Sequence, residues 1–203
     1  MKRRGIAKAI VVWVFFFMLP VLVYSETEDK ERGTKSKRYI LSPNIGYEYY
    51  HAGILYGVSI NTGIIGCDFV YLGPSGFTLY ADAEIIFGTS VSRRTSSDEI
   101  IKKGTGGINL DLFLGYSWEF NQKHKLGLAG GPQFSFASEF DSYGLGARLS
   151  YSYEIIEKIG IMATSTGSIS VNFQKTDFGE FGIKSNLCGI GRFALKLGPY
   201  FQL

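Results

Sequence analysis

The chain has 203 residues with 26 glycines, 15% aromatic residues and only 19% charged residues. This length suits one domain, and frequent glycine, tyrosine and phenylalanine favour twisted β structure over helix. The formal net charge of +3 does not indicate nucleic-acid binding. Four of the 21 basic residues lie in the first eight positions, and the remaining 17 are balanced by 18 acidic residues.

Residues 1–25 have the layout of a cleaved secretory signal peptide. Lys2, Arg3 and Arg4 make the start positive, residues 9–23 are apolar apart from a proline, and Val23 and Ser25 stand at positions −3 and −1 of the expected cleavage site. An uncleaved anchor helix is the alternative, but the apolar run is short for a bilayer, which needs about 20 residues. No cysteine follows the run, so the segment is not a lipoprotein signal.

Residues 26–38 alternate in charge and contain no large apolar residue, which predicts a disordered periplasmic tail. From residue 39 to residue 203 apolar and polar residues alternate with a period of two, so this segment is predicted to be one β domain. The two cysteines, Cys67 and Cys188, fall on expected strands that are not neighbours, and no disulfide is predicted.

Eight strands are predicted from the alternation, and the pattern is clearest in residues 108–120. Each strand is long enough to cross a membrane as part of a tilted barrel, which takes about 9–11 residues. The apolar positions of the second strand change parity, which predicts a bulge at Ile65 and Gly66. Short turns alternate with longer connections at 89–107 and 174–186. The predicted strands are residues 39–50, 55–71, 77–88, 108–120, 126–137, 143–155, 159–173 and 187–203.

The distribution of charge favours a membrane barrel over a soluble one. Ten ionisable residues fall within the predicted strands, all on the polar face: Glu48, Asp68, Asp82, Glu84, Asp111, Glu119, Arg148, Glu154, Arg192 and Lys196. The rest of that face is mostly glycine, serine, threonine and asparagine, which suits a narrow lumen. Aromatic residues gather at strand ends on the apolar face, as at a membrane interface. A soluble lipocalin-like barrel, with the apolar face inside, is the alternative.

The chain resembles the small outer-membrane β-barrels, such as the OmpA transmembrane domain, OmpX, OmpW and the opacity proteins. The resemblance rests on the signal peptide, the eight alternating segments and the last strand, FALKLGPYFQL (residues 193–203). The resemblance covers residues 39–203 and implies an all-β fold: an eight-stranded antiparallel up-and-down transmembrane β-barrel in a bacterial outer membrane. It also implies insertion by the barrel-assembly machinery, which reads the last strand. Leu203 stands where this group usually has an aromatic residue, and Phe201 lies two residues earlier.

The interior charges are the main candidate site. A lumen network is predicted from Glu48, Asp82, Glu84, Asp111, Arg148, Arg192 and Lys196. It has two interpretations: a structural plug of paired charges, or a gate in a narrow ion path. All ten inward charges sum to about −4, which implies that some carboxylates are hydrated or protonated. His51 and His124 form no recognisable catalytic or metal-binding pattern, so no enzyme activity, cofactor or metal site is expected.

Basic residues in the connection 89–107 are the second candidate site. Arg93, Arg94, Lys102 and Lys103 could contact lipopolysaccharide-like glycolipid or host and envelope ligands, although a solvated loop explains them too. The expected role is therefore structural or surface-interacting, in adhesion or envelope integrity. The alternative is a narrow channel or OmpW-like transport of small hydrophobic molecules. A lipid-modifying enzyme is disfavoured because no catalytic constellation is recognisable.

Overall fold

The computed structural model describes residues 37–52, 58–93, 99–102, 106–120, 123–137, 141–172, 176–178, 183–185 and 189–203. Residues Arg38–Leu203 form one compact unit. The predicted signal peptide and almost all of the predicted tail lie outside the described residues. The first strand begins at Arg38, one residue earlier than predicted. No helix in the described segments is long and apolar enough to span a membrane.

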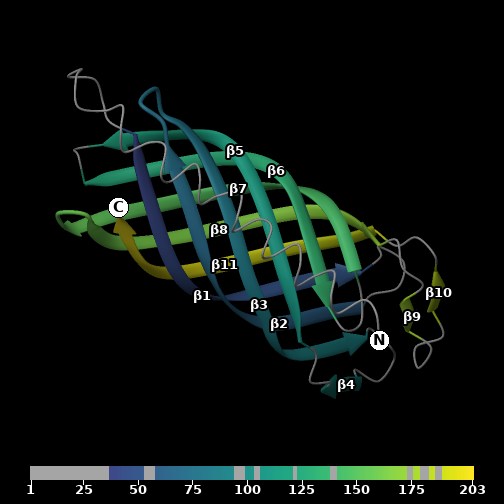
Figure 1. The fold of residues 1–203 in the computed structure, drawn as a ribbon. Coiled ribbons are helices and arrows are strands. Elements are labelled where there is room, and N and C mark those ends of the chain that lie inside the picture. Colours follow the sequence, from purple (N-terminus) through teal and green to yellow (C-terminus); the bar gives the residue numbers. More distant parts are fainter. Residues whose placement is uncertain are drawn as a thin grey trace, which may run out of the picture. The chain divides into compact units, whose positions relative to one another are not determined.

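Eight long antiparallel strands form the wall of a closed barrel (Figure 1). The first strand pairs with the last, and a further pairing of the second with the third closes the sheet. The predicted eight-stranded barrel is thus confirmed. The wall strands are β1 Arg38–Ala52, β2 Val58–Leu72, β3 Phe77–Arg93, β5 Gly107–Phe120, β6 His124–Ala137, β7 Asp141–Ile156, β8 Ile159–Asn172 and β11 Gly189–Gln202.

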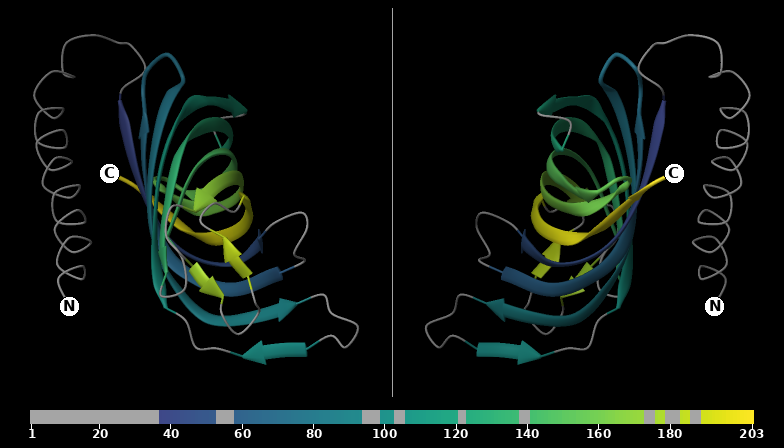
Figure 2. Two further views of the ribbon diagram at one scale, coloured as in Figure 1. Left: turned by 90° about the vertical axis from the view of Figure 1, so that its right-hand side faces the viewer. Right: turned by 90° about the vertical axis from the view of Figure 1, so that its left-hand side faces the viewer.

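Three short strands add to the barrel at one end. β4 Glu99–Lys102 pairs with β3, and β9 Thr176–Phe178 pairs with β10 Ile183–Ser185 in a separate two-stranded sheet (Figure 2). The connection 89–107 was predicted to be a loop throughout, and this prediction is wrong. β3 continues to Arg93 and pairs with β4. The reason is that strand pairing uses backbone hydrogen bonds, so residues 89–93 can continue the strand although the run of apolar residues has ended.

Tight turns close the opposite end, which also carries the C-terminus (Figure 1). Gly76, with φ of 91°, ends the turn between β2 and β3, where its N–H donates to the Gly73 carbonyl (3.0 Å). Lys158, with φ of 68°, lies in the turn between β7 and β8. The predicted contrast between short turns at one end and longer connections at the other is present. In a barrel of the outer-membrane type, the tight-turn end faces the periplasm.

Burial shows which face of the wall is inside. Large apolar side chains cover the outside, with Leu145 and Ile169 exposed at 72% and 78%, whereas charged side chains such as Glu48 and Arg148 are completely buried within the barrel. A soluble barrel would bury the apolar face instead. The lipocalin-like alternative is therefore wrong, and the outer surface is one that a lipid bilayer would cover.

The predicted bulge in β2 is wrong. Ile60 and Ile64 are buried on the lumen side and Ile65 is exposed outside, so β2 does not change phase at Ile65. The irregularity lies opposite, in β3: Asn61 pairs with Ser90 but Gly63 pairs with Phe87, which leaves one extra residue on β3. Gly88, with φ of 63°, provides the left-handed backbone that such a bulge needs. The apolar residues of β2 suggested a parity change because isoleucines are also packed inside the lumen.

Candidate functional site

Eight charged residues meet inside the barrel and are here named the charged layer. These eight residues come from six strands, and none is more than 5% exposed. Neighbouring strands place them at one level because Asp68 of β2 lies opposite Asp82 of β3, which lies opposite Asp111 of β5. The charged layer consists of Glu48, Asp68, Asp82, Glu84, Asp111, Arg148, Arg192 and Lys196.

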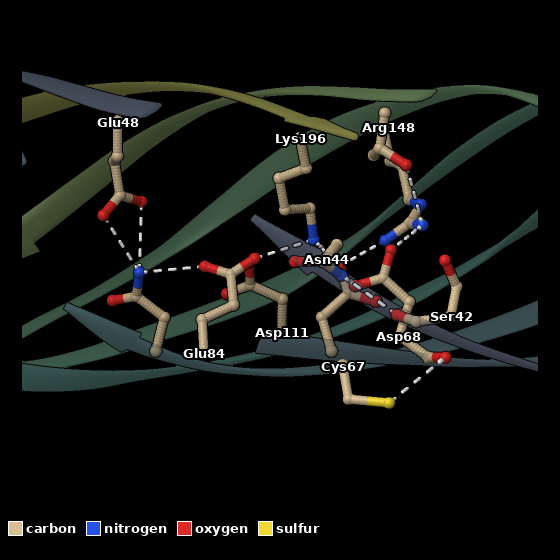
Figure 3. A network of polar contacts seen from close by, with 12 residues as sticks. Ser42, Asn44, Glu48, Cys67, Asp68, Glu84, Asp111, Arg148 and Lys196 are labelled. Atoms are coloured by element: carbon tan, nitrogen blue, oxygen red, sulfur yellow. Dashed lines mark hydrogen bonds and ion pairs between the residues drawn. The ribbon is translucent and has the colours of Figure 1, made fainter. Parts of the chain in front are cut away.

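Arg148 joins the two aspartates of β2 and β3. Its guanidinium donates to Asp68 Oδ2 (2.6 Å) and to Asp82 Oδ2, and also to the hydroxyl of Thr164 (3.2 Å). The guanidinium carbon lies 4.4 Å from the ring centroid of Tyr80, a cation–π contact. Arg148 is thus held by three neighbouring polar groups of the lumen, with Asp68 among them (Figure 3), and also by the aromatic face of Tyr80.

Lys196 contacts three carboxylates. Its ammonium group donates to Asp68 Oδ1 (2.9 Å), Asp82 Oδ2 (2.9 Å) and Glu84 Oε1 (2.7 Å). A lysine ammonium has three N–H donors, so its donor capacity is used fully within this group (Figure 3).

Arg192 joins the remaining acids. It donates to Glu48, to Glu84 Oε2 (2.9 Å) and to both carboxylate oxygens of Asp111 (2.9 Å each). The amide of Asn109 donates to Glu48 (3.0 and 3.1 Å) and to Glu84 (3.1 Å), and Gln133 donates to Asp111 (3.1 Å). These amides supply hydrogen bonds that the three cations cannot provide.

The network connects all eight wall strands, because Gln133 belongs to β6 and Thr164 to β8. All seven residues of the predicted lumen network are brought together. The prediction omitted Asp68 from that network, although it had placed this residue on the polar face; its contact with both Arg148 and Lys196 makes it central. Five carboxylates against three cations give the charged layer a formal charge of −2 when all are ionised.

The other two inward acids belong to a separate group at the tight-turn end. Glu119 pairs with Arg38 (2.5 Å) and lies 3.7 Å from Lys125, and Tyr200 donates to Glu154 (3.5 Å). Arg38 and Lys125 were not predicted as lumen residues, because they were assigned to the tail and to a turn. Their charges offset the two glutamates, so the interior sum of about −4 is corrected to −2.

An apolar layer lies between the charged layer and the tight-turn end. Two of its aromatic members, Tyr80 and Phe113, stand two residues from Asp82 and Asp111 on their strands, towards that end. Tyr80 also bonds the hydroxyls of Ser117 and Ser150 (3.0 Å each), which fixes its ring under Arg148. The apolar layer consists of Ile40, Val70, Leu72, Tyr80, Phe113, Ala129, Met162 and Tyr200.

The predicted surface site is described only in part. Arg93 ends β3 opposite Glu99, and Lys102 ends β4 opposite Ser90, so their backbone is paired sheet. Arg94 and Lys103 lie outside the described residues. The interaction of these four residues with a glycolipid or another ligand stays a prediction.

Neither histidine belongs to the charged layer, although His51 follows Glu48 by three residues on β1. His51 pairs with Ser59 near the outer end of β1 and β2. His124 bonds the hydroxyl of Tyr151 (2.7 Å) at the tight-turn end. Of the acidic, histidine and cysteine groups in the described residues, Asp68, Asp82 and Glu84 place ligand atoms within 4.8 Å of one another and could hold a metal ion. The ammonium of Lys196 contacts all three.

Comparison with known proteins agrees with this architecture. The outer membrane protein OprG from Pseudomonas aeruginosa superposes with a TM-score of 0.57 at 12% identity, covering 84% of this chain and 98% of OprG. Neisserial surface protein A (NspA) gives a TM-score of 0.55 at 10% identity, covering 80% of this chain and 96% of NspA. A search of curated proteins found no match.

The fold shared with these two structures confirms the predicted resemblance to small outer-membrane barrels, and the predicted location in a bacterial outer membrane agrees with the apolar outer surface. The model of one protein family matches residues 32–203, which include the whole barrel. The chain therefore belongs to the family described as Domain of unknown function (DUF2715), with the fold of an eight-stranded outer-membrane β-barrel.

Proposed function

We propose that the protein is a closed outer-membrane barrel with a structural and surface-interaction role, in envelope integrity or adhesion, rather than a channel. The observation that carries this proposal is the sealed interior. A water-filled pore would leave the side chains that line it accessible to water. Every residue of the charged layer is at most 5% exposed, and every residue of the apolar layer is at most 6% exposed.

The two layers act in different ways. Paired charges fill the middle of the lumen, where each cation contacts two or three carboxylates. The apolar layer then leaves a hydrated ion few polar groups to replace its water, and desolvation of a charge in such surroundings is costly. A barrel of eight strands is just wide enough for its side chains to fill the interior.

The outer end of the barrel supports a role at the surface. Beyond Phe87, a large apolar residue exposed on the outside of β3, the strand continues through the mostly polar residues 88–93 and pairs with β4. Paired sheet beyond the apolar belt gives loops a stable base for contacts outside the membrane. One of the two similar structures is itself named a surface protein. The proposal assigns no catalytic activity, and insertion would depend on the barrel-assembly machinery.

A narrow ion path is the second candidate. It is favoured by the formal charge of −2 and by buried oxygens without a hydrogen-bond partner, among them Asn44 Oδ1 and Asp82 Oδ1. Such atoms call for water, which a conducting path would contain. OmpW-like transport of hydrophobic molecules is less well supported, because the charged layer crosses the lumen.

Conductance of the refolded barrel in planar bilayers tests the proposal. Folding is first verified by heat-modifiable mobility on gels, and a porin measured in the same bilayers shows that channels would be detected. The expected result is a folded barrel without reproducible channels. Channels whose conductance changes in Arg192→Ala would refute the closed-barrel proposal and favour the ion path.

A further inference from the structure

We propose that the outside of the barrel wall at the tight-turn end binds one anionic phospholipid of the periplasmic leaflet, with Lys123 and His124 at its phosphate. Leu128 and Leu149 line one of its acyl chains. β6 begins and β7 ends at this end of the barrel, which also carries the C-terminus (Figure 1). The inference concerns the outside of the wall and does not depend on whether the lumen conducts.

The imidazole of His124 lies on the lipid-facing side of the wall. Lys125, the next residue, is buried in the lumen, so the alternation along β6 turns His124 outward. His124 pairs with Phe120 of β5 and with Tyr153 of β7, and both aromatic side chains are exposed on the outside. This is the level at which an aromatic girdle meets the lipid headgroups.

Two tyrosines of β7 orient the imidazole. Its Nδ1 lies 2.7 Å from the Tyr151 hydroxyl oxygen, and its ring centroid lies 4.9 Å from that of Tyr153. When the Tyr151 hydroxyl donates to Nδ1, the ring proton is on Nε2, and a protonated imidazole carries a proton on both nitrogens. In both states the Nε2–H group remains to donate to a phosphate oxygen.

The charge beside the imidazole complements a phosphate diester. Lys123 is exposed and makes no ion pair with any of the described residues. Its backbone carbonyl accepts a hydrogen bond from the Glu154 N–H (2.8 Å), which fixes the turn against β7. The carboxylates of Glu119 and Glu154 are bonded within the lumen instead and do not compete for this ammonium group. A positive charge therefore remains at the headgroup level next to a hydrogen-bond donor.

The wall next to this position is apolar over most of one leaflet. Leu128 pairs with Leu149, and each is about half exposed on the outside, four residues from His124 and Tyr153 along their strands. At about 3.4 Å per residue and a strand tilt of about 40°, this pair lies ~10 Å deeper in the membrane. One leaflet contributes about half of the ~30 Å hydrocarbon core, so an acyl chain whose headgroup is at His124 passes these leucines. A phospholipid can make both sets of contacts, whereas a free phosphate ion can make only the polar ones.

The test measures which lipid the refolded full barrel retains. The barrel is equilibrated with equal amounts of phosphatidylglycerol and phosphatidylcholine that carry the same acyl chains, and bound lipid is counted by native mass spectrometry. The wild type should retain one phosphatidylglycerol about fivefold more often than phosphatidylcholine, the preference expected for one basic residue at an anionic lipid surface. Lys123→Gln combined with His124→Phe, which keeps an aromatic ring in the girdle, should abolish this preference. Each single substitution should lower it in part.

Lys158→Gln is the matched control, because Lys158 is also exposed in a turn at this end but follows an acidic residue, Glu157, instead of preceding a histidine. It should keep the preference. The NMR signals of the His124 imidazole should shift saturably with short-chain phosphatidylglycerol and not with sodium phosphate, with His51, the other histidine of the chain, as reference. Equal retention of both lipids by the wild type, or an equal loss of preference in Lys158→Gln, would overturn the proposal. Equal shifts with sodium phosphate would overturn the assignment to a lipid.

Discussion

Removal of Arg148 is the sharpest test of the charged layer as a structural element. Arg148→Met leaves Asp68 and Asp82 with Lys196 as their shared cation and raises the excess charge of the layer from −2 to −3. The contact with the Tyr80 ring and the bond to Thr164 are also lost. Removing one partner of a buried ion pair costs about 3–5 kcal/mol.

For a chain of this length, each kcal/mol lowers the melting temperature by about 2–4 °C, so the expected decrease is ~6–20 °C. The decrease is measured by the temperature at which the folded band disappears on gels. Arg148→Lys should fall between the wild type and Arg148→Met, because it keeps the charge but loses the paired donors. Adding Asp82→Asn to Arg148→Met should recover part of the loss, since it removes one unpaired charge. A melting temperature for Arg148→Met within about 2 °C of the wild type would refute the argument.

Three further predictions concern the apolar layer, the outer belt and the packing of the wall. Phe113→Ala, at a fully buried position, should cost about 3–5 kcal/mol in the same melting assay, and a change below 1 kcal/mol would contradict a packed layer. Leu145→Arg should cost about 2–4 kcal/mol and lower insertion into vesicles, whereas full tolerance would argue against lipid contact. Gly131→Ala should reduce refolding yield, because a Cβ there would lie 2.0 Å from the Leu112 carbonyl oxygen, whereas Gly167→Ala has open space and should refold normally; equal yields would contradict the close approach.

The tertiary structure decided details that alternation could not reveal. Isoleucine occurs on both faces of β2, so Ile60 and Ile64 suggested a bulge that in fact lies at Gly88, in the neighbouring strand. Lys125 was assigned to a turn because nothing local distinguishes a turn lysine from one that points into the lumen. The continuation of β3 into a hairpin with β4 was missed because its polar residues resemble a loop.

What the sequence determined by itself was the alternation, and the alternation sufficed for the eight strands and for the inverted barrel. Side chains on a strand point to opposite faces in turn, so a face that carries all the charges must face away from lipid. Which charges pair was decided only by closure of the barrel. Glu48 and Arg192 are 144 positions apart along the chain and meet because β1 pairs with β11. No local pattern contains that contact, since the register between distant strands depends on the whole closed sheet.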